Sequence, residues 1–101
     1  MDQELCPKME KTLNLLGKKW VGLILYALID GPKKFGEIEK YIPNISARVL
    51  TERLKELEKI NIIEKHIYNE FHIRIEYELT KKGVDLNDSF ETIYKWAQKW
   101  N

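Results

Sequence analysis

The chain of 101 residues has few of the features that mark a secreted, membrane-bound or cross-linked protein. It contains one cysteine, which excludes an internal disulfide framework and fits a reducing compartment. No apolar run approaches the roughly 20 residues that a membrane-spanning helix needs, and no signal-peptide pattern opens the sequence. We therefore expect a soluble cytoplasmic protein with no membrane partner.

The sequence also lacks the residue patterns of common catalytic and metal sites. Its two histidines, His66 and His72, stand in no cluster of histidines, cysteines or carboxylates at metal-ligand spacing. A phosphate-binding glycine loop, a dinucleotide fingerprint and a nucleophile–base set are all missing. We therefore expect no enzyme activity, no cofactor and no metal.

Charge of one sign is scarce as well, since 17 Lys and Arg face 16 Asp and Glu for a net charge of +1. This balance alone is weak support for nucleic-acid binding. The cations of residues 33–59 nevertheless fall together, interleaved with glutamates, which predicts a basic stripe and not a basic patch. With 44% hydrophobic residues, residues 1–101 are expected to form a single domain with one core.

Helical spacing of apolar residues dominates the first 60 residues. Pro7 is expected to begin a first helix that ends near Leu16. A second helix over residues 20–29 is apolar nearly all round, which predicts the buried centre of the fold. A short third helix covers residues 35–41. Ser46 then caps a fourth helix that runs to about residue 60 and turns one stripe inward, made of Leu50, Leu54 and Leu57.

The period changes from 3.6 to 2 after Asn61, which predicts two half-buried strands joined through residues 69–72. Thr80 is expected to cap a last helix over residues 81–100. The chain is thus expected to be mainly α with a small β-hairpin. This order of helices and hairpin predicts a winged helix-turn-helix, a construction that reads double-stranded DNA.

The outer face of the fourth helix is the expected DNA-reading surface, because an α-helix fits the major groove. Arg48 can donate two hydrogen bonds to a guanine edge, and Thr51 can meet a base or a thymine methyl. Lys55 is better placed for a phosphate, and Glu52 lies on the same face. The alternative is that these are ordinary solvated residues of a surface helix.

Further contacts are expected around this helix, each with an alternative. Ser46 can cap the helix and also donate to a phosphate. Arg53 can contact a phosphate or pair with a neighbouring glutamate. Lys33 and Lys34 lead into the third helix, whose amides favour a phosphate, but they can equally be loop lysines. Arg74 is the wing cation expected to reach the minor groove or its phosphates.

Cys6 directly precedes Pro7, the first expected helical residue. A helix N-terminus stabilises a thiolate, which makes the cysteine a hypothetical redox sensor. Oxidation would then give a disulfide to a second subunit, a mixed disulfide or a sulfenic acid. The alternative is a small buried hydrophobe, and the residues alone leave both open.

Assembly is expected through the terminal helices, because the last one has more apolar surface than a small domain covers. Its residues alternate by four and three, and together with the first helix they make a plausible two-fold interface. The alternative is that the seam packs only on its own domain. The residues expected in dimerisation are Leu13, Leu16, Leu86, Phe90, Ile93, Tyr94, Ala97 and Trp100.

Several strings together resemble the HxlR-type transcriptional regulators, which are close to the MarR-type winged helices. They are Cys6-Pro7, LGKKW at 16–20, DGPKKFGE at 30–37, RLKELE at 53–58 and IEYELT at 75–80. The resemblance implies a homodimer that binds a palindromic operator as repressor or activator. In several members a cysteine before the first helix responds to oxidants, quinones or aldehydes, which implies the same role for Cys6.

The function expected is that of a homodimeric DNA-binding regulator, most simply a repressor, with an oxidant or small molecule as effector. Two alternatives stay open. One is a winged helix used as a protein-interaction module, which the near-neutral charge would suit. The other is a regulator whose signal is a small ligand held between the wing and the aromatic last helix, with Cys6 silent.

Overall fold

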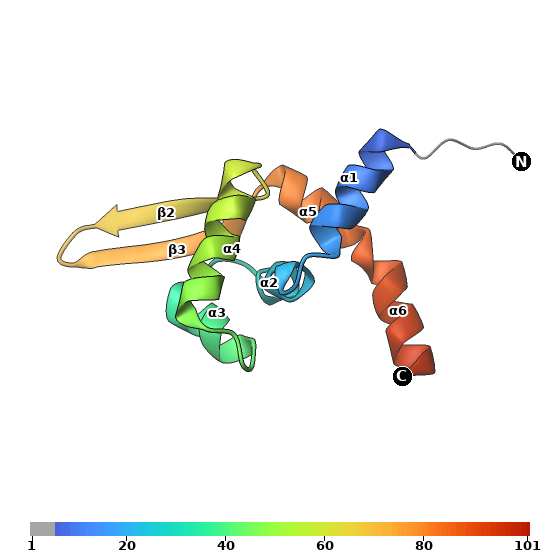
Figure 1. Cartoon of the computed structure of the whole chain (residues 1–101). Helices are drawn as coiled ribbons and strands as arrows, with labels where there is room; N and C mark the ends of the chain where they lie inside the picture. Colours follow the sequence, from blue (N-terminus) through green and yellow to red (C-terminus); the bar gives the residue numbers. More distant parts are fainter. Residues whose placement is uncertain (1–5) are drawn as a thin grey trace, which may run out of the picture.

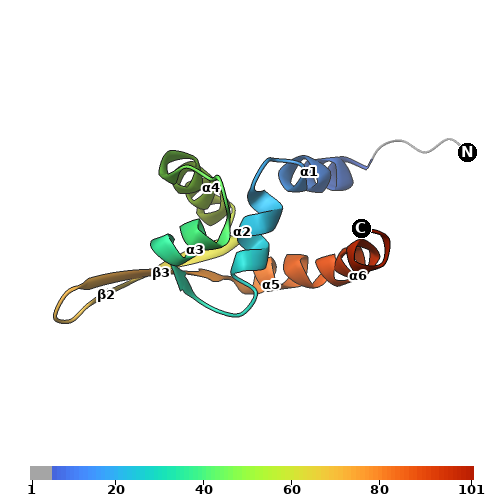
Figure 2. The ribbon, with the colours of Figure 1, turned by 90° about the horizontal axis from the view of Figure 1, so that it is seen from below.

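The structure is a computed structural model that describes residues 6–101 (Figure 1). The molecule is elongated, with extents of 62 × 30 × 24 Å. A β-hairpin projects from one end, and the terminal helices lie at the other end (Figures 1 and 2). The helices are α1 (Pro7–Leu16), α2 (Val21–Ala27), α3 (Phe35–Tyr41), α4 (Ala47–Lys59), α5 (Lys81–Asp88) and α6 (Phe90–Trp100).

The core forms around α2, which lies between the pair α3–α4 and the terminal helices. The predicted helix over residues 20–29 is shorter at both ends, because Trp20 takes a left-handed backbone with φ 80° and Leu28 ends the helix. Its apolar surface is not buried all round either. Leu23 is 49% exposed and Tyr26 is also exposed, so one side of α2 faces outward.

The wing is a three-stranded antiparallel sheet in the order β1-β3-β2, and not the predicted pair of strands. Its strands are β1 (Lys33–Lys34), β2 (Ile63–Asn69) and β3 (Ile73–Leu79). The extra strand β1 is two residues long and pairs Lys33 with Tyr77. The short strand β1, directly before α3, is therefore paired with β3 at the root of the wing.

The burial of the wing decreases from its root to its tip. Ile63 and Leu79 are buried in the core, whereas Ile67 and Ile73 are exposed and Phe71 at the turn is 98% exposed. The prediction of two half-buried strands is therefore right at the root and wrong at the tip. The outer part of the hairpin extends beyond the helices that could cover it (Figure 1).

The predicted last helix over residues 81–100 is wrong as one element, because it divides at Ser89 into α5 and α6. The Ser89 hydroxyl donates to the Asp85 carbonyl at 3.3 Å, a local bond of the kind that bends helices. The Thr80 cap is confirmed, since its hydroxyl accepts from the Gly83 amide at 3.1 Å. Gly83 is required there, because a Cβ would lie 2.2 Å from the Ile62 carbonyl oxygen.

Candidate nucleic-acid interface

Helix α4 forms where its sequence predicts, and its inner and outer faces differ sharply. The Ser46 hydroxyl accepts a hydrogen bond from the Val49 amide at 3.1 Å, which caps the helix. Leu50, Leu54 and Leu57 are buried, as the helical spacing predicts. The opposite side carries the polar residues and is exposed along its length, so no part of residues 6–101 covers it.

Arg48 is a highly accessible cation of this outer face, with its side chain 87% exposed. Its Nε lies 3.4 Å from a carboxylate oxygen of Glu52, one turn further along. Exposed pairs at this spacing contribute only about 0.3–0.5 kcal/mol, so the guanidinium can leave Glu52 for another acceptor at little cost. Glu52 therefore orients the Arg48 side chain but leaves it able to bind another acceptor.

Thr51 lies on the exposed flank of the helix, between the leucine stripe and Arg48. Its hydroxyl donates to the Ala47 carbonyl at 2.8 Å, one turn back in the same helix. With the hydroxyl proton used in this way, the side chain offers a methyl group and an accepting oxygen to a partner. These are the groups that suit a thymine methyl or a base amino group in the major groove.

Three lysines gather where the end of α4 meets the wing. Lys55, Lys59 and Lys65 line a shallow groove together with Glu58, so three cationic residues share it with one anionic residue. The sequence predicts a phosphate contact for Lys55 but no role for Lys65. The alternating pattern of β2, which includes Lys65, can be read from the sequence. The contact between that strand and α4 cannot.

The Arg53 side chain is bound to other residues of the protein. Its Nε donates to the Lys19 carbonyl at 3.1 Å and its Nη1 lies 3.4 Å from Glu56, whose other oxygen is 2.9 Å from Lys18. Its side chain is only 17% exposed. Arg53 thus braces α4 against the turn before α2, so we leave it out of the DNA-contact set that the sequence suggested.

The two lysines before α3 have different surroundings. Lys34 is exposed at the start of the helix, and its backbone amide donates to Glu37 at 2.9 Å. Lys33 is partly buried and lines a pocket between α2, α3 and α6. Lys34 is therefore the more exposed of the two, and a DNA contact of Lys33 stays a prediction.

Arg74 lies on the outer part of the wing, where it is held by its neighbours. Its guanidinium carbon lies 4.4 Å from the centre of the Tyr68 ring, and its Nε lies 3.6 Å from Glu76. The side chain is about half exposed. Arg74 can reach a phosphate only by giving up part of these contacts.

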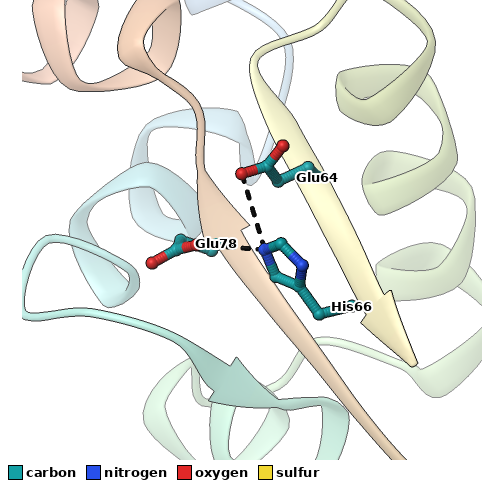
Figure 3. Close-up of side chains that lie close together, drawn as sticks. All are labelled: Glu64, His66 and Glu78. Carbon is teal, nitrogen blue, oxygen red and sulfur yellow. Dashed lines mark hydrogen bonds and ion pairs between the residues drawn. The ribbon is translucent and has the colours of Figure 1, made fainter. Parts of the chain in front are cut away.

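The root of the wing brings together three side chains that the sequence analysis kept apart (Figure 3). Nε2 of His66 lies 3.0 Å from Glu78 and 3.5 Å from Glu64. The expectation that neither histidine lies in a cluster of carboxylates is wrong for His66, because Glu78 comes from the neighbouring strand. The imidazole separates two carboxylates that are directly opposite in register and would otherwise repel each other.

Cys6 is exposed at the N-terminal end of α1. This contradicts the alternative in which it is a small buried hydrophobe. Its carbonyl accepts from the Glu10 amide at 2.9 Å, so the residue stands at the N-cap position as the sequence predicts. A thiol at this position is accessible to a reagent in solution.

The apolar residues of the terminal helices fall into two groups. Leu16, Leu86 and Phe90 are partly buried against the core, so the alternative in which the seam packs on its own domain applies to them. Ala97 is partly buried as well. The exposed apolar side chains of α1 and α6, two helices at the end of the molecule opposite the wing, are together called the terminal surface. This terminal surface consists of Met9, Leu13, Ile93, Trp96 and Trp100. Tyr94 is also exposed but stacks on Tyr26, with ring centres 5.8 Å apart.

Among the described residues, no helix is both long enough and apolar enough to span a bilayer.

The chain is similar in sequence to known transcriptional regulators. A family model described as "HxlR-like helix-turn-helix" matches residues 15–101. The chain is 46% identical over 100 residues to the HTH-type transcriptional regulator YodB of Bacillus subtilis, covering 99% of this chain and 89% of YodB. It is also 46% identical over 97 residues to the uncharacterized HTH-type transcriptional regulator YvaP of the same organism, covering 96% and 90% of the two chains.

Solved structures give the same result in three dimensions. The reduced form of YodB from B. subtilis superposes with a TM-score of 0.85, covering 96% of this chain and 95% of that one. The redox regulator HypR in its oxidized form, 35% identical, superposes with a TM-score of 0.86 and covers 95% and 98% of the two chains. Such relatives are transcriptional regulators, which is a non-enzymatic class.

Proposed function

This chain belongs to the HxlR-like helix-turn-helix family of transcriptional regulators, and from that premise we propose that it is a cytoplasmic homodimeric repressor of a palindromic operator. In this proposal residues 1–101 act as a single winged helix-turn-helix domain. The observation that carries the proposal is the exposed outer face of α4, with Arg48 free to exchange its weak partner. A dimer bound across a promoter would block polymerase.

In the proposed complex α4 lies in the major groove. Arg48 and Thr51 face base edges, where a bidentate arginine–guanine contact discriminates against other bases by about 1–3 kcal/mol. Ser46 keeps a hydroxyl proton to donate to a phosphate, because its oxygen already accepts from Val49. Lys34 holds the backbone on one side of the helix.

The lysine groove at the end of α4 supplies the phosphate contacts on the other side. Lys55, Lys59 and Lys65 lie around one hollow, where a DNA strand leaving the major groove would find three ammonium groups. Each neutralised phosphate releases counterions, so binding should weaken as salt rises. Arg74 contributes less, because Glu76 and Tyr68 already hold it.

The terminal surface is the proposed dimer interface. Two tryptophans, an isoleucine, a leucine and a methionine exposed together form an apolar area that water solvates poorly. The surface lies opposite the wing (Figure 1), so pairing two copies through it would leave both α4 helices free. A two-fold dimer reads half-sites separated by roughly one DNA turn, about 34 Å.

Cys6 is the proposed sensor of oxidants or electrophiles in this dimer. Support comes from its exposure at the start of α1, beside the terminal surface, and from the relatives. YodB has been solved after diamide treatment and in a quinone-bound form, and HypR is described as a redox regulator. Diamide would take two electrons and two protons from the Cys6 thiols of two subunits, which would then join as a disulfide.

The sensing proposal is tested by DNA affinity before and after diamide, in wild type and in Cys6→Ser. We expect diamide to weaken binding by the wild type and to leave Cys6→Ser unchanged. Wild-type affinity that survives the treatment, or equal loss in both proteins, would remove Cys6 from the account.

The DNA-binding proposal is tested by selecting bound duplexes from a random pool. We expect an enriched inverted repeat whose half-site centres are about 10 base pairs apart. A pool that stays random after repeated rounds would refute sequence-specific binding. Enrichment of a single, unrepeated motif would refute the palindromic operator.

A further inference from the structure

A pocket of about 420 Å³ opens between the helix-turn-helix and the C-terminal helices. Tyr26 of α2, Tyr41 of α3 and Tyr94 of α6 form its aromatic walls, and Asn87 of α5 lies in the same lining. The volume falls within the range of small-ligand sites, about 300–1,000 Å³. The pocket is on the α2–α3 side of the last helices, away from the wing tip, and it plays no part in the proposed DNA contacts.

The tyrosines already interact with one another through their rings. Tyr26 and Tyr94 are stacked, with centres 5.8 Å apart and planes inclined by 22°, and Tyr41 lies 6.2 Å from Tyr26. The pKa of Tyr26 is raised by its side-chain hydrogen bond with Tyr94 and then by burial, so its phenol is neutral at physiological pH. The stacked aromatic rings make the walls flat, which favours a flat aromatic ligand.

Asn87 supplies the polar anchor of the pocket. It is only 4% exposed, and its Nδ2 donates to the Leu25 carbonyl at 2.9 Å. Its Oδ1 accepts no hydrogen bond from the described residues. A buried acceptor without a donor is destabilising, and a ligand with an N–H or O–H donor would satisfy it.

The charged residues around the pocket indicate whether a cationic or an anionic ligand is favoured. Asp30, Asp88 and Glu91 contribute carboxylates to the lining, and Lys33 contributes one ammonium group. Glu91 is already paired with Lys95 at 3.6 Å, whereas Asp30 and Asp88 have no ion-pair partner among the described residues. The uncompensated charge is negative, which favours a cation over a carboxylate.

From this combination we propose that the pocket binds an aromatic amine, a flat ring with an N–H donor and a positively charged side chain. The ring lies against Tyr26 and Tyr94, the ring donor bonds to Asn87, and the ammonium group faces Asp30 and Asp88. Aromatic walls, a buried acceptor that lacks a donor and a negative rim together define this class of ligand.

The position of the pocket connects the ligand to DNA binding, and this part rests on the proposed function. Lys33 and Tyr41 belong to the segment that carries α3, whereas Tyr94 belongs to α6 beyond the break at Ser89. At 100° per residue, Tyr94 and Glu91 are on a different flank of α6 from Ile93 and Trp100 of the terminal surface. A ligand can therefore occupy the pocket without covering the proposed dimer interface, while changing the angle at which α6 leaves the core.

Binding is tested by titration calorimetry of the 101-residue chain with three matched probes. Tryptamine carries the ring N–H and the ammonium group, indole-3-acetate reverses the charge, and 1-methyltryptamine removes the ring donor. We expect saturable binding of tryptamine, at least ten-fold weaker binding of indole-3-acetate and about five-fold weaker binding of 1-methyltryptamine. No saturable binding of tryptamine at millimolar concentration, or equal binding of all three probes, would overturn the proposal.

Two exposed positions on α6 locate the site without disturbing the core. Tyr94→Ala should weaken tryptamine binding at least ten-fold, whereas Thr92→Ala, outside the pocket lining, should bind within two-fold of wild type. Equal affinity of the two variants would place the probe elsewhere and refute the assignment.

The coupling is tested separately, by the affinity of the protein for its selected duplex with and without tryptamine. A shift of at least three-fold supports the coupling, and unchanged affinity refutes it. The calorimetry involves no DNA, so failure of the pocket and failure of the proposed DNA binding give different results.

Discussion

Replacing Arg48 by alanine separates DNA recognition from folding. Arg48 is 87% exposed and has one weak partner, Glu52, so its removal should change the free energy of unfolding by about 0.5 kcal/mol or less. The guanine contact it is proposed to make is worth about 1–3 kcal/mol, or ~5- to 150-fold in affinity for each half-site. The expected loss of binding therefore exceeds the loss of stability several-fold.

The assay is fluorescence anisotropy with the selected duplex and with a duplex in which the contacted base pair is changed. The matched control is Lys95→Ala, which removes a cation that is 75% exposed from an i,i+4 pair with Glu91 on α6. We expect Arg48→Ala to bind both duplexes weakly and nearly equally, and Lys95→Ala to keep the wild-type preference. An Arg48→Ala protein that retains wild-type affinity and base preference would refute the placement of α4 in the groove.

Three further perturbations address the phosphate contacts, the fold and the assembly. Lys34→Ala should weaken binding to all duplexes about equally and reduce the slope of log affinity against log salt by about 1, measured by anisotropy; a loss confined to the selected duplex would contradict this. Gly83→Ala should cost about 1–3 kcal/mol in urea unfolding, because its Cβ would collide with the Ile62 carbonyl, whereas Gly36→Ala, with no atom within 4 Å, should not destabilise; equal costs would refute the close approach. Trp100→Ala should weaken the dimer by about 2 kcal/mol, ~30-fold, in sedimentation equilibrium; a monomeric wild type at micromolar concentration would exclude the interface.

Much of the fold could be predicted because the determining interactions are local. The Ser46 cap depends on an amide three residues away, and the inward leucines of α4 depend only on helical period. The two long strands were visible from alternation alone. For the same reason Pro7 marked the start of α1 correctly.

The rest depends on contacts between distant parts of the chain, which no local pattern contains. Lys33 pairs with Tyr77, which makes the third strand, and Arg53 donates to the carbonyl of Lys19. The second contact holds the Arg53 guanidinium against the turn before α2, away from the predicted DNA surface. The carboxylates beside His66 were missed in the same way, since they meet only when β2 and β3 pair.

Ser89 is a local signal for the division of the last helix, because its hydroxyl can bond to the backbone one turn back. The hydrophobic spacing across it favours one continuous helix instead. The seam of apolar residues continues across it, which predicts one straight helix. The hydroxyl bond to Asp85 and the anchor of Asn87 on α2 instead fix α5 to the core and let α6 turn away. A seam therefore predicts which residues share a face but not whether the backbone beneath them stays straight.

The central claim is that the outer face of α4 lies in the major groove, and site-directed cross-linking tests it most directly. A photoreactive group attached at position 51, in a Thr51→Cys protein with Cys6→Ser, should cross-link to major-groove bases of the selected duplex. The same group at position 95 on α6 should give no cross-link. Cross-links from position 95 and none from position 51 would contradict the account.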